Sequence, residues 1–244
     1  MKKLLLAGVA SVGFVASANA SVTASASLFS PLQPAGANTT LVAIQGASAP
    51  TQNTFNGAGF SITFNNTGAD EGIVQGQADV RHAIPTAGVT ASGQETYLSG
   101  DYNSAQTISE AGSGKYLSTG LGTITITFST PQTSLALLWG SIDASNRISF
   151  GDAANDSLTG TQVQALAAGF TQNGFQGPRG SAYVTATTDT SFSTVTLSSG
   201  VVSFEAAGIA ASNVPFTAVP EPASFALLGA GLVGAGMLRR RKSV

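Results

Sequence analysis

The sequence predicts an all-β protein, an antiparallel and jelly-roll-like β-sandwich flanked by an N-terminal signal peptide and a single C-terminal hydrophobic helix. Three observations lead to this prediction. Short segments that alternate apolar and polar residues recur along the chain, turn residues separate them, and only one internal segment suits a helix. Alternation with a period of two between turns is typical of half-buried strands, and many such strands form sandwiches or barrels.

The clearest expected strands are 59–64 and 122–128, and we expect Ser129-Thr130-Pro131 to end the second. The run 135–139 is continuously apolar, which predicts a central strand covered on both faces. Residues 206–218 suit a last edge segment that leads into a linker. Further strands are expected at 22–29, 41–44, 147–150, 182–186, 193–197 and 201–204, and a short helix at 162–168.

The N-terminus has the layout of a secretory signal peptide over residues 1–20. Lys2 and Lys3 precede an apolar run at 4–15, and Ala18 and Ala20 supply small residues for signal peptidase. The run is shorter than the roughly 20 residues that a membrane span needs. We expect cleavage after Ala20 and a body domain over 21–212.

The C-terminus continues from a linker at 213–222 into 223–238, which carries no charge and forms the expected hydrophobic helix. A basic tail at 239–244 follows, and it should remain cytoplasmic because positive residues flank membrane helices on that side. The body would then lie on the opposite side of the inner membrane. The topology residues are Arg239, Arg240, Arg241 and Lys242.

This C-terminal segment resembles the PEP-CTERM sorting signal of Gram-negative bacteria that make extracellular polysaccharide. The resemblance covers 219–244 and includes Pro220, Glu221 and Pro222, a Gly-rich apolar helix and the basic tail. It implies that a membrane exosortase recognises the Pro-Glu-Pro triplet. It also implies that the helix is removed, and that the body is released or attached at the cell surface. The alternative is an unprocessed single-pass anchor.

The charge of the body excludes some partners. Between residues 21 and 218 there are four basic and eleven acidic residues, a net charge of −7, and the chain has no cysteine. Nucleic acids are bound mainly through Lys and Arg, so we expect no nucleic-acid partner. Without disulfides, an exported domain depends on packing alone for its stability.

A second resemblance covers roughly 116–210, to a family of exosortase-dependent surface proteins with a Trp-Gly-Ser-x-Asp-x-x-Asn-x-x-x-Phe core. That core matches Trp139 to Phe150, and Phe204-Glu205 matches a later pair, although Ala206 and Ala207 stand where the family often has Asp-Asn. The resemblance implies a β-sandwich surface protein and no established activity.

Two interpretations of this core remain open from the sequence. Asp143 and Asn146 are typical turn residues and would close a structural hairpin or corner. Alternatively, five oxygen-bearing side chains within fourteen residues would suit a weak calcium site, since calcium takes oxygen ligands. These candidates are Asp143, Asn146, Asp152, Asn155 and Asp156.

Support for catalysis is slight. His82 is the only histidine, and the chain lacks a Gly-x-Ser-x-Gly elbow, a His-Glu-x-x-His motif and a phosphate loop. The nearest carboxylates for a hydrolase are Asp70, Glu71 and Asp101. We therefore expect no enzyme and no cofactor. The expected role is structural or adhesive, at the cell surface or in an exopolysaccharide biofilm matrix. A carbohydrate-binding module is the alternative, and a secreted hydrolase the less favoured one.

Overall fold

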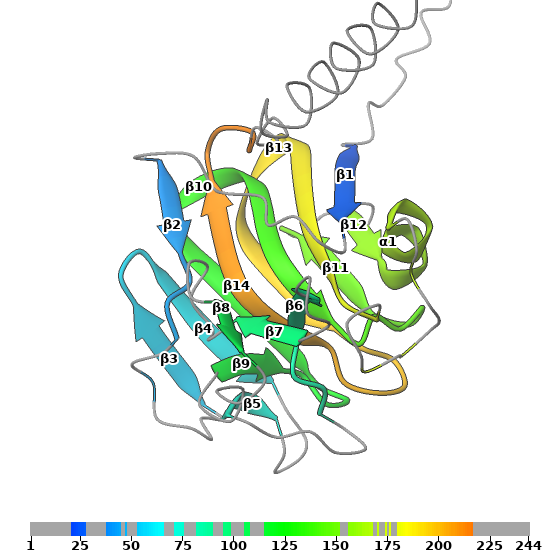
Figure 1. Cartoon of the computed structure of the whole chain (residues 1–244). Coiled ribbons are helices and arrows are strands. Elements are labelled where there is room, and N and C mark those ends of the chain that lie inside the picture. Colours follow the sequence, from blue (N-terminus) through cyan, green and yellow to red (C-terminus); the bar gives the residue numbers. More distant parts are fainter. Residues whose placement is uncertain are drawn as a thin grey trace, which may run out of the picture.

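The computed structural model describes residues 21–27, 38–44, 47, 53–65, 71–75, 82–89, 95–98, 105–107, 115–151, 156–167, 170, 174, 176 and 180–216. The fold is antiparallel β, as predicted. Eleven strands form one hydrogen-bonded sheet, and three more form a small second sheet (Figure 1). The jelly-roll-like sandwich and the domain limits 21–212 stay predictions.

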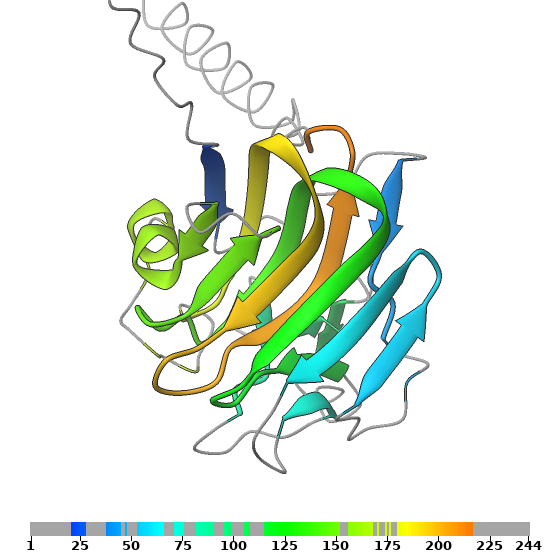
Figure 2. The ribbon, with the colours of Figure 1, turned by 180° about the vertical axis from the view of Figure 1, so that it is seen from behind.

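Two long strands form the centre of the main sheet. β10 (Thr123–Gly140) and β13 (Ala182–Ser198) pair antiparallel along their lengths and curve together (Figure 2). At one end, β4 (Phe60–Asn65) pairs with β10 and β3 (Thr54–Gly57) lies outside it. On the other side, β11 (Arg147–Phe150) joins β13 to β12 (Ser157–Thr159).

The other half of the sheet is built on β14 (Glu205–Ser212), which pairs with the second half of β10. β9 (Lys115–Ser118) and β2 (Thr39–Leu41) pair with β14, and β5 (Gly72–Gln75) pairs with β9. β1 (Val22–Ser27) adds to the outer side of β13.

The small sheet contains β6 (Thr86–Val89), β7 (Glu95–Leu98) and β8 (Ala105–Thr107). β6 lies against β10 and β13 of the main sheet. The helix α1 (Gly160–Leu166) follows β12 directly and packs beside β1. Thr159 caps its first turn, with Gln162 as the reciprocal partner of the capping box.

The sequence wrongly predicts that β10 ends at Pro131. The strand continues, with shifts of register between Thr127 and Ser134 where it bends. Proline cannot donate to a ladder and is tolerated at bulges. Gln132 stabilises this bulge, since its Nε2 donates to the backbone oxygen of Thr130 at 2.7 Å and to the Thr130 hydroxyl at 2.9 Å. The expected strands at 182–186 and 193–197 are likewise one continuous β13.

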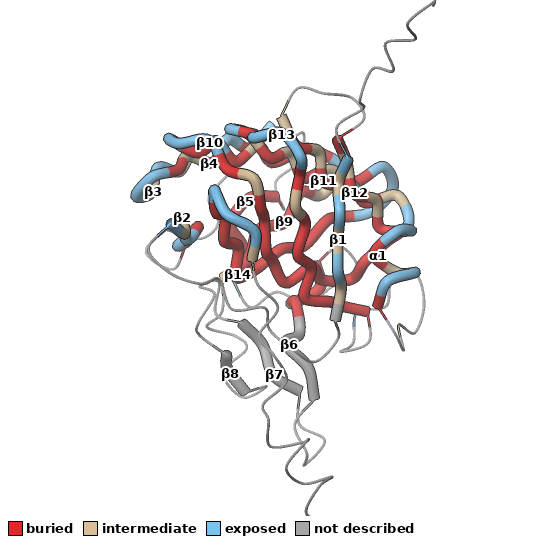
Figure 3. The backbone as a smooth tube through the Cα atoms, turned by 90° about the horizontal axis from the view of Figure 1, so that it is seen from above, coloured by how far each residue is buried: buried red, intermediate tan, exposed pale blue. Residues whose placement is uncertain are grey.

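The main core cluster includes residues from both halves of the bent strand β10. Ile124 and Ile126 from the first half of β10 and Leu137 and Trp139 from its second half belong to it. All residues from Leu135 to Gly140 are buried, which confirms the predicted strand covered on both faces. β14 is also wholly buried (Figure 3), so the expected edge segment at 206–218 is wrong over its first part.

Candidate functional site

The two parts of the sequence motif meet where β10 ends and β14 begins. Gly140 faces Glu205 in the antiparallel register, and Trp139 faces Ala206. The rings of Trp139 and Phe204 stack with centroids 4.4 Å apart and an interplanar angle of 19°, and both side chains are fully buried. Segments more than sixty residues apart in the sequence therefore form one junction.

Glu205 is the central polar group of this junction. Its side chain is 1% exposed, and the hydroxyls of Ser141 and Ser203 both donate hydrogen bonds to its carboxylate. The backbone of Ala83 supplies a further hydrogen bond. Burial raises the pKa of Glu205 to about 7, an effect that the nearby charge of Asp143 reinforces and that these three hydrogen bonds oppose. Near neutral pH this buried carboxyl therefore carries a proton part of the time.

Ser141 holds its position with an unusual backbone conformation. Its φ is +31°, and no other non-glycine residue among those described has a positive φ. Positive φ is disfavoured for residues with a side chain, and it persists where surrounding contacts compensate for the strain. The hydrogen bond to Glu205 is one such contact, since it forms just where the chain turns out of β10.

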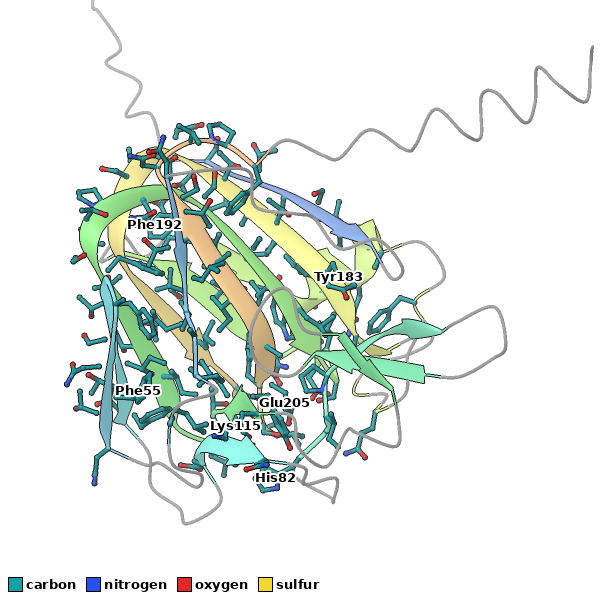
Figure 4. All side chains as sticks on the ribbon, turned by 60° about the vertical axis from the view of Figure 1, so that its left-hand side comes forward. Phe55, His82, Lys115, Tyr183, Phe192 and Glu205 are labelled. Atoms are coloured by element: carbon teal, nitrogen blue, oxygen red, sulfur yellow. The ribbon has the colours of Figure 1, made fainter. Side chains whose placement is uncertain are left out.

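The segment 82–85 covers the same junction. A Cβ atom added at Gly140 would lie 3.0 Å from Pro85 Cγ and 3.2 Å from Pro85 Cα, so glycine permits this close approach. His82 is 2% exposed and is next to Ala83 in the chain, which bonds Glu205. Figure 4 places both Glu205 and His82 towards the same end of the sheet.

Asp143 and Asn146 close a tight turn after β10, because the backbone N–H of Asn146 donates to the Asp143 carbonyl at 3.0 Å. Asp143 is 8% exposed, and burial raises the pKa of its carboxyl. Asn146 is fully buried, and neither its Oδ1 nor its Nδ2 has a hydrogen-bond partner within the described structure. The hairpin-or-corner interpretation matches this geometry.

The calcium candidates do not all come together. Asn146 precedes β11, whereas Asp156 faces Phe150 at the far end of the same hairpin, where the Phe150 N–H donates to its carbonyl at 2.8 Å. Four residues of strand correspond to about 13 Å, which is too far for ligands of one calcium ion. Asp152 and Asn155 lie outside the described residues. Within the described part of the chain, no three His, Cys, Asp or Glu side chains gather as a metal site would need.

Of the three carboxylates named as hydrolase candidates, the structure describes only Glu71. Asp70 and Asp101 lie outside the described residues. Glu71 is 6% exposed, and its Oε1 accepts a hydrogen bond from the backbone N–H of Leu121 at 3.1 Å. Gly120 makes room for that carboxylate with a φ of +51°. Glu71 thus fixes the turn that enters β10.

Sequence reasoning did not find the hydroxyl pair around Glu205. Ser141 and Glu205 belong to the motif, and the sequence predicts a strand at 201–204 for Ser203, where the structure has a loop. The available signal was a lone carboxylate between Phe204 and a run of alanines. An acidic residue entering an apolar strand needs polar partners, because burial of an unpaired charge is costly.

Comparison with known protein families gives one match. Residues 218–242 match the model of the PEP-CTERM protein-sorting motif. The chain carries a PEP-CTERM sorting signal. No curated protein and no solved structure matches the chain. The match supports the first resemblance, whereas the Trp139 to Phe150 core stays a prediction.

The PEP-CTERM signal defines the route of the protein. It is recognised by an exosortase, so the protein is exported, processed at the membrane and sorted to the cell surface or the extracellular space. The signal residues Pro220, Glu221 and Pro222, the helix 223–238 and the basic tail all lie outside the described residues, as do Ala18 and Ala20. In the described ranges, no helix has the length and apolar character to cross a membrane.

Proposed function

We propose that the processed protein is a structural or adhesive component of the cell surface or extracellular matrix, associated with exopolysaccharide. The PEP-CTERM signal supports the location. The observation that carries the role is that the polar residues of the motif face inward. Ser141 is 6% exposed, Asp143 8% and Glu205 1%. The hydrogen bonds of Glu205 to the Ser141 hydroxyl and to the Ala83 backbone connect β14 with the end of β10 and with the segment 82–85.

The described surface also favours a structural role over glycan binding. Carbohydrate-binding modules stack sugars on exposed aromatic rings. The large hydrophobic side chains that are exposed in the described part of the chain are all aliphatic, namely Leu41, Leu121, Leu166, Val201, Val202 and Val214. A catalytic role has less support than a structural one, because the carboxyl with the raised pKa is buried. Among the carboxyls that the structure describes, Glu205 has a pKa raised to about 7, which suits proton transfer near neutral pH, but its side chain is closed to solvent.

The test is a deletion strain of the producing organism, complemented in turn by the native gene and by a triple variant of Pro220, Glu221 and Pro222 to Ala. We expect the deletion to reduce surface adhesion and the polysaccharide retained by washed cells. The native gene should restore both, and the triple variant should restore neither, because it would not be sorted. Unchanged adhesion and matrix retention in the deletion strain would contradict the proposal.

Binding measurements separate the alternatives. Protein recovered from the native host would be titrated with the producer's own polysaccharide. Saturable binding that free sugars compete would favour the carbohydrate-binding module. Release of new reducing ends from the polysaccharide would favour the hydrolase. A flat response in both assays, with loss of adhesion in the deletion strain, is the result expected here.

A further inference from the structure

The residue that follows the expected signal-peptidase site contacts an aspartate on the neighbouring strand. Ser21 comes directly after Ala20, and its backbone nitrogen lies 3.4 Å from Asp189 Oδ2. The Ser21 hydroxyl donates to the same carboxylate oxygen at 2.5 Å, and the Asp189 N–H approaches the Ser21 carbonyl at 3.4 Å. Ser21 and Asp189 thus close the end of the β1–β13 ladder.

The strand that begins there is held along its length by its ladder with β13 and by packing against α1. β1 is an edge strand that pairs only with β13 in the described sheet. Its inward residues, Val22, Ala24 and Ala26, are small and only partly buried. Chain ends fray unless they are tied down, and the contact at Ser21 ties down the first residue of this strand.

Cleavage would change the charge of that contact. Hydrolysis of the Ala20–Ser21 peptide bond adds one water, leaves a carboxylate on Ala20 and converts the amide nitrogen of Ser21 into an α-amino group that takes up a proton near neutral pH. We propose that this new ammonium group pairs with the Asp189 carboxylate, so that signal-peptide removal itself fastens β1 onto β13. The inference rests on cleavage after Ala20 and is independent of the adhesive role.

Among the described elements that pack against β1, Asp189 is the titratable group that faces Ser21. β1 packs against β13, α1 and β12. Neither α1 nor β12 contains a titratable residue. Tyr183 is at the opposite end of the ladder, where it faces Ser27. Asp156 lies just before β12 and is 5% exposed, with its side chain buried.

The ion pair between Ser21 and Asp189 would affect how aminopeptidases act on the exported protein. An aminopeptidase needs a free, extended N-terminus, whereas an ion-paired Ser21 at the end of a strand is held against the sheet. The junction would therefore protect the mature protein from trimming. It would also make β1 more secure after processing than before it.

The experiment uses protein recovered from the native host, with N-terminal sequencing to establish that it begins at Ser21. The α-amino group reacts with acylating reagents only as the free amine, so the ion pair slows this reaction. At pH 7.5 we expect acylation of Ser21 to be about twofold to fourfold slower in the native protein than in Asp189→Asn, as is typical of an exposed ion pair. Aminopeptidase trimming should accelerate in parallel in that variant.

Two controls make the result specific. Ser21→Ala removes the hydroxyl but keeps the ammonium and carboxylate, so its acylation should remain as slow as in the native protein. Salt at 1 M screens exposed ion pairs and should accelerate acylation of the native protein, a measurement that needs no variant. Equal acylation rates in native protein and Asp189→Asn, no effect of salt, or a mature N-terminus other than Ser21 would each overturn the inference. None of these outcomes would affect the adhesion assay of the deletion strain.

Discussion

Gly140 and Glu205 face one another across β10 and β14, and a Cβ atom added at Gly140 would lie 3.2 Å from the Cβ of Glu205. The buried carboxylate of Glu205 therefore lies beside β10 at Gly140, where β10 has no side chain. The segment 82–85 closes over the pair, with Pro85 against Gly140 and the Ala83 backbone bonded to Glu205. The packing of Pro85 and Gly140 and the protonation of Glu205 therefore occur at the same junction.

Stability should fall as pH rises through the range where Glu205 titrates. Its pKa is raised from 4.5 to about 7 in the folded protein, so between these values the folded state binds more protons than the unfolded state. The free energy of unfolding therefore decreases with rising pH there, by roughly 3 kcal/mol for this shift, and the group adds no further slope above about pH 7. Urea unfolding at pH 4.5, 6 and 8 measures the effect.

Glu205→Gln is the matched control, because it keeps the side-chain shape and removes the titration. We expect a flatter profile and higher stability than the native protein at pH 8. A smaller slope of the same sign should remain, since burial also raises the pKa of Asp143. Glu205→Ala should be destabilised at every pH, because the Ser141 and Ser203 hydroxyls lose their acceptor. Parallel profiles for native protein and Glu205→Gln would refute the assignment.

Gly140→Ala should destabilise the fold by about 1–3 kcal/mol, as expected for an added methyl group in a packed region. The new Cβ would meet Pro85 at 3.0 Å, and one of the atoms there belongs to the backbone. Gly200→Ala is the control, because its Cβ would find only Ser145 at an ordinary 3.7 Å. We expect that control to stay within about 0.5 kcal/mol of the native protein. Equal thermal unfolding of the two variants would show that Pro85 moves aside at no cost.

Local pattern was enough to predict strands whose alternation is clean. β4 and β11 fall at or within one residue of their expected limits, and α1 starts two residues early because Thr159 caps it. The pattern could not show that β10 and β13 continue through their bends. A proline normally ends a strand, but here side-chain bonds of Gln132 and Thr188 stabilise the bends. The Thr188 hydroxyl donates to the Thr133 and Thr190 carbonyls.

The sequence of β14 does not reveal its interior position, for a different reason. Its sequence is mostly alanine and glycine, which have low β-propensity, and its place in the sheet interior depends on close packing against neighbouring strands rather than on its own pattern. The contacts of the candidate site cannot be predicted from local pattern either. Trp139, Ser141 and Glu205 were visible as motif residues, but their contacts depend on a register between strands that are distant in sequence.

Trp139 and Phe204 should be energetically coupled. The chain has one tryptophan, so its fluorescence reports directly on this junction. In a cycle of Trp139→Leu, Phe204→Leu and the double variant, chemical unfolding followed by circular dichroism should give a coupling energy of about 0.5–1.5 kcal/mol, typical of aromatic pairs. Phe204→Leu should also shift the Trp139 emission maximum. A coupling energy near zero would mean that the 4.4 Å stacking contributes burial alone.

Calcium should leave the stability of the body unchanged. The hairpin register separates Asn146 from Asp156, so these two oxygen donors cannot share one ion. We expect thermal unfolding midpoints in 5 mM calcium chloride and in EDTA to agree within about 1 °C, since a bound ion would stabilise the folded state by mass action. A clear rise with calcium would instead implicate the turn at Asp143 together with residues of the 152–155 segment.

Processing should require the Pro-Glu-Pro triplet, because the triplet lies within the sorting match at 218–242. Replacing Pro220, Glu221 and Pro222 by Ala should leave a protein that keeps residues 223–244 and is recovered with the membrane fraction. The native protein should have an intact mass that lacks both residues 1–20 and that tail. Val201→Ala, at an exposed position in the body, should be processed like the native protein. A native protein whose mass retains the tail would instead make it a membrane-anchored protein, and the variant would then show no change.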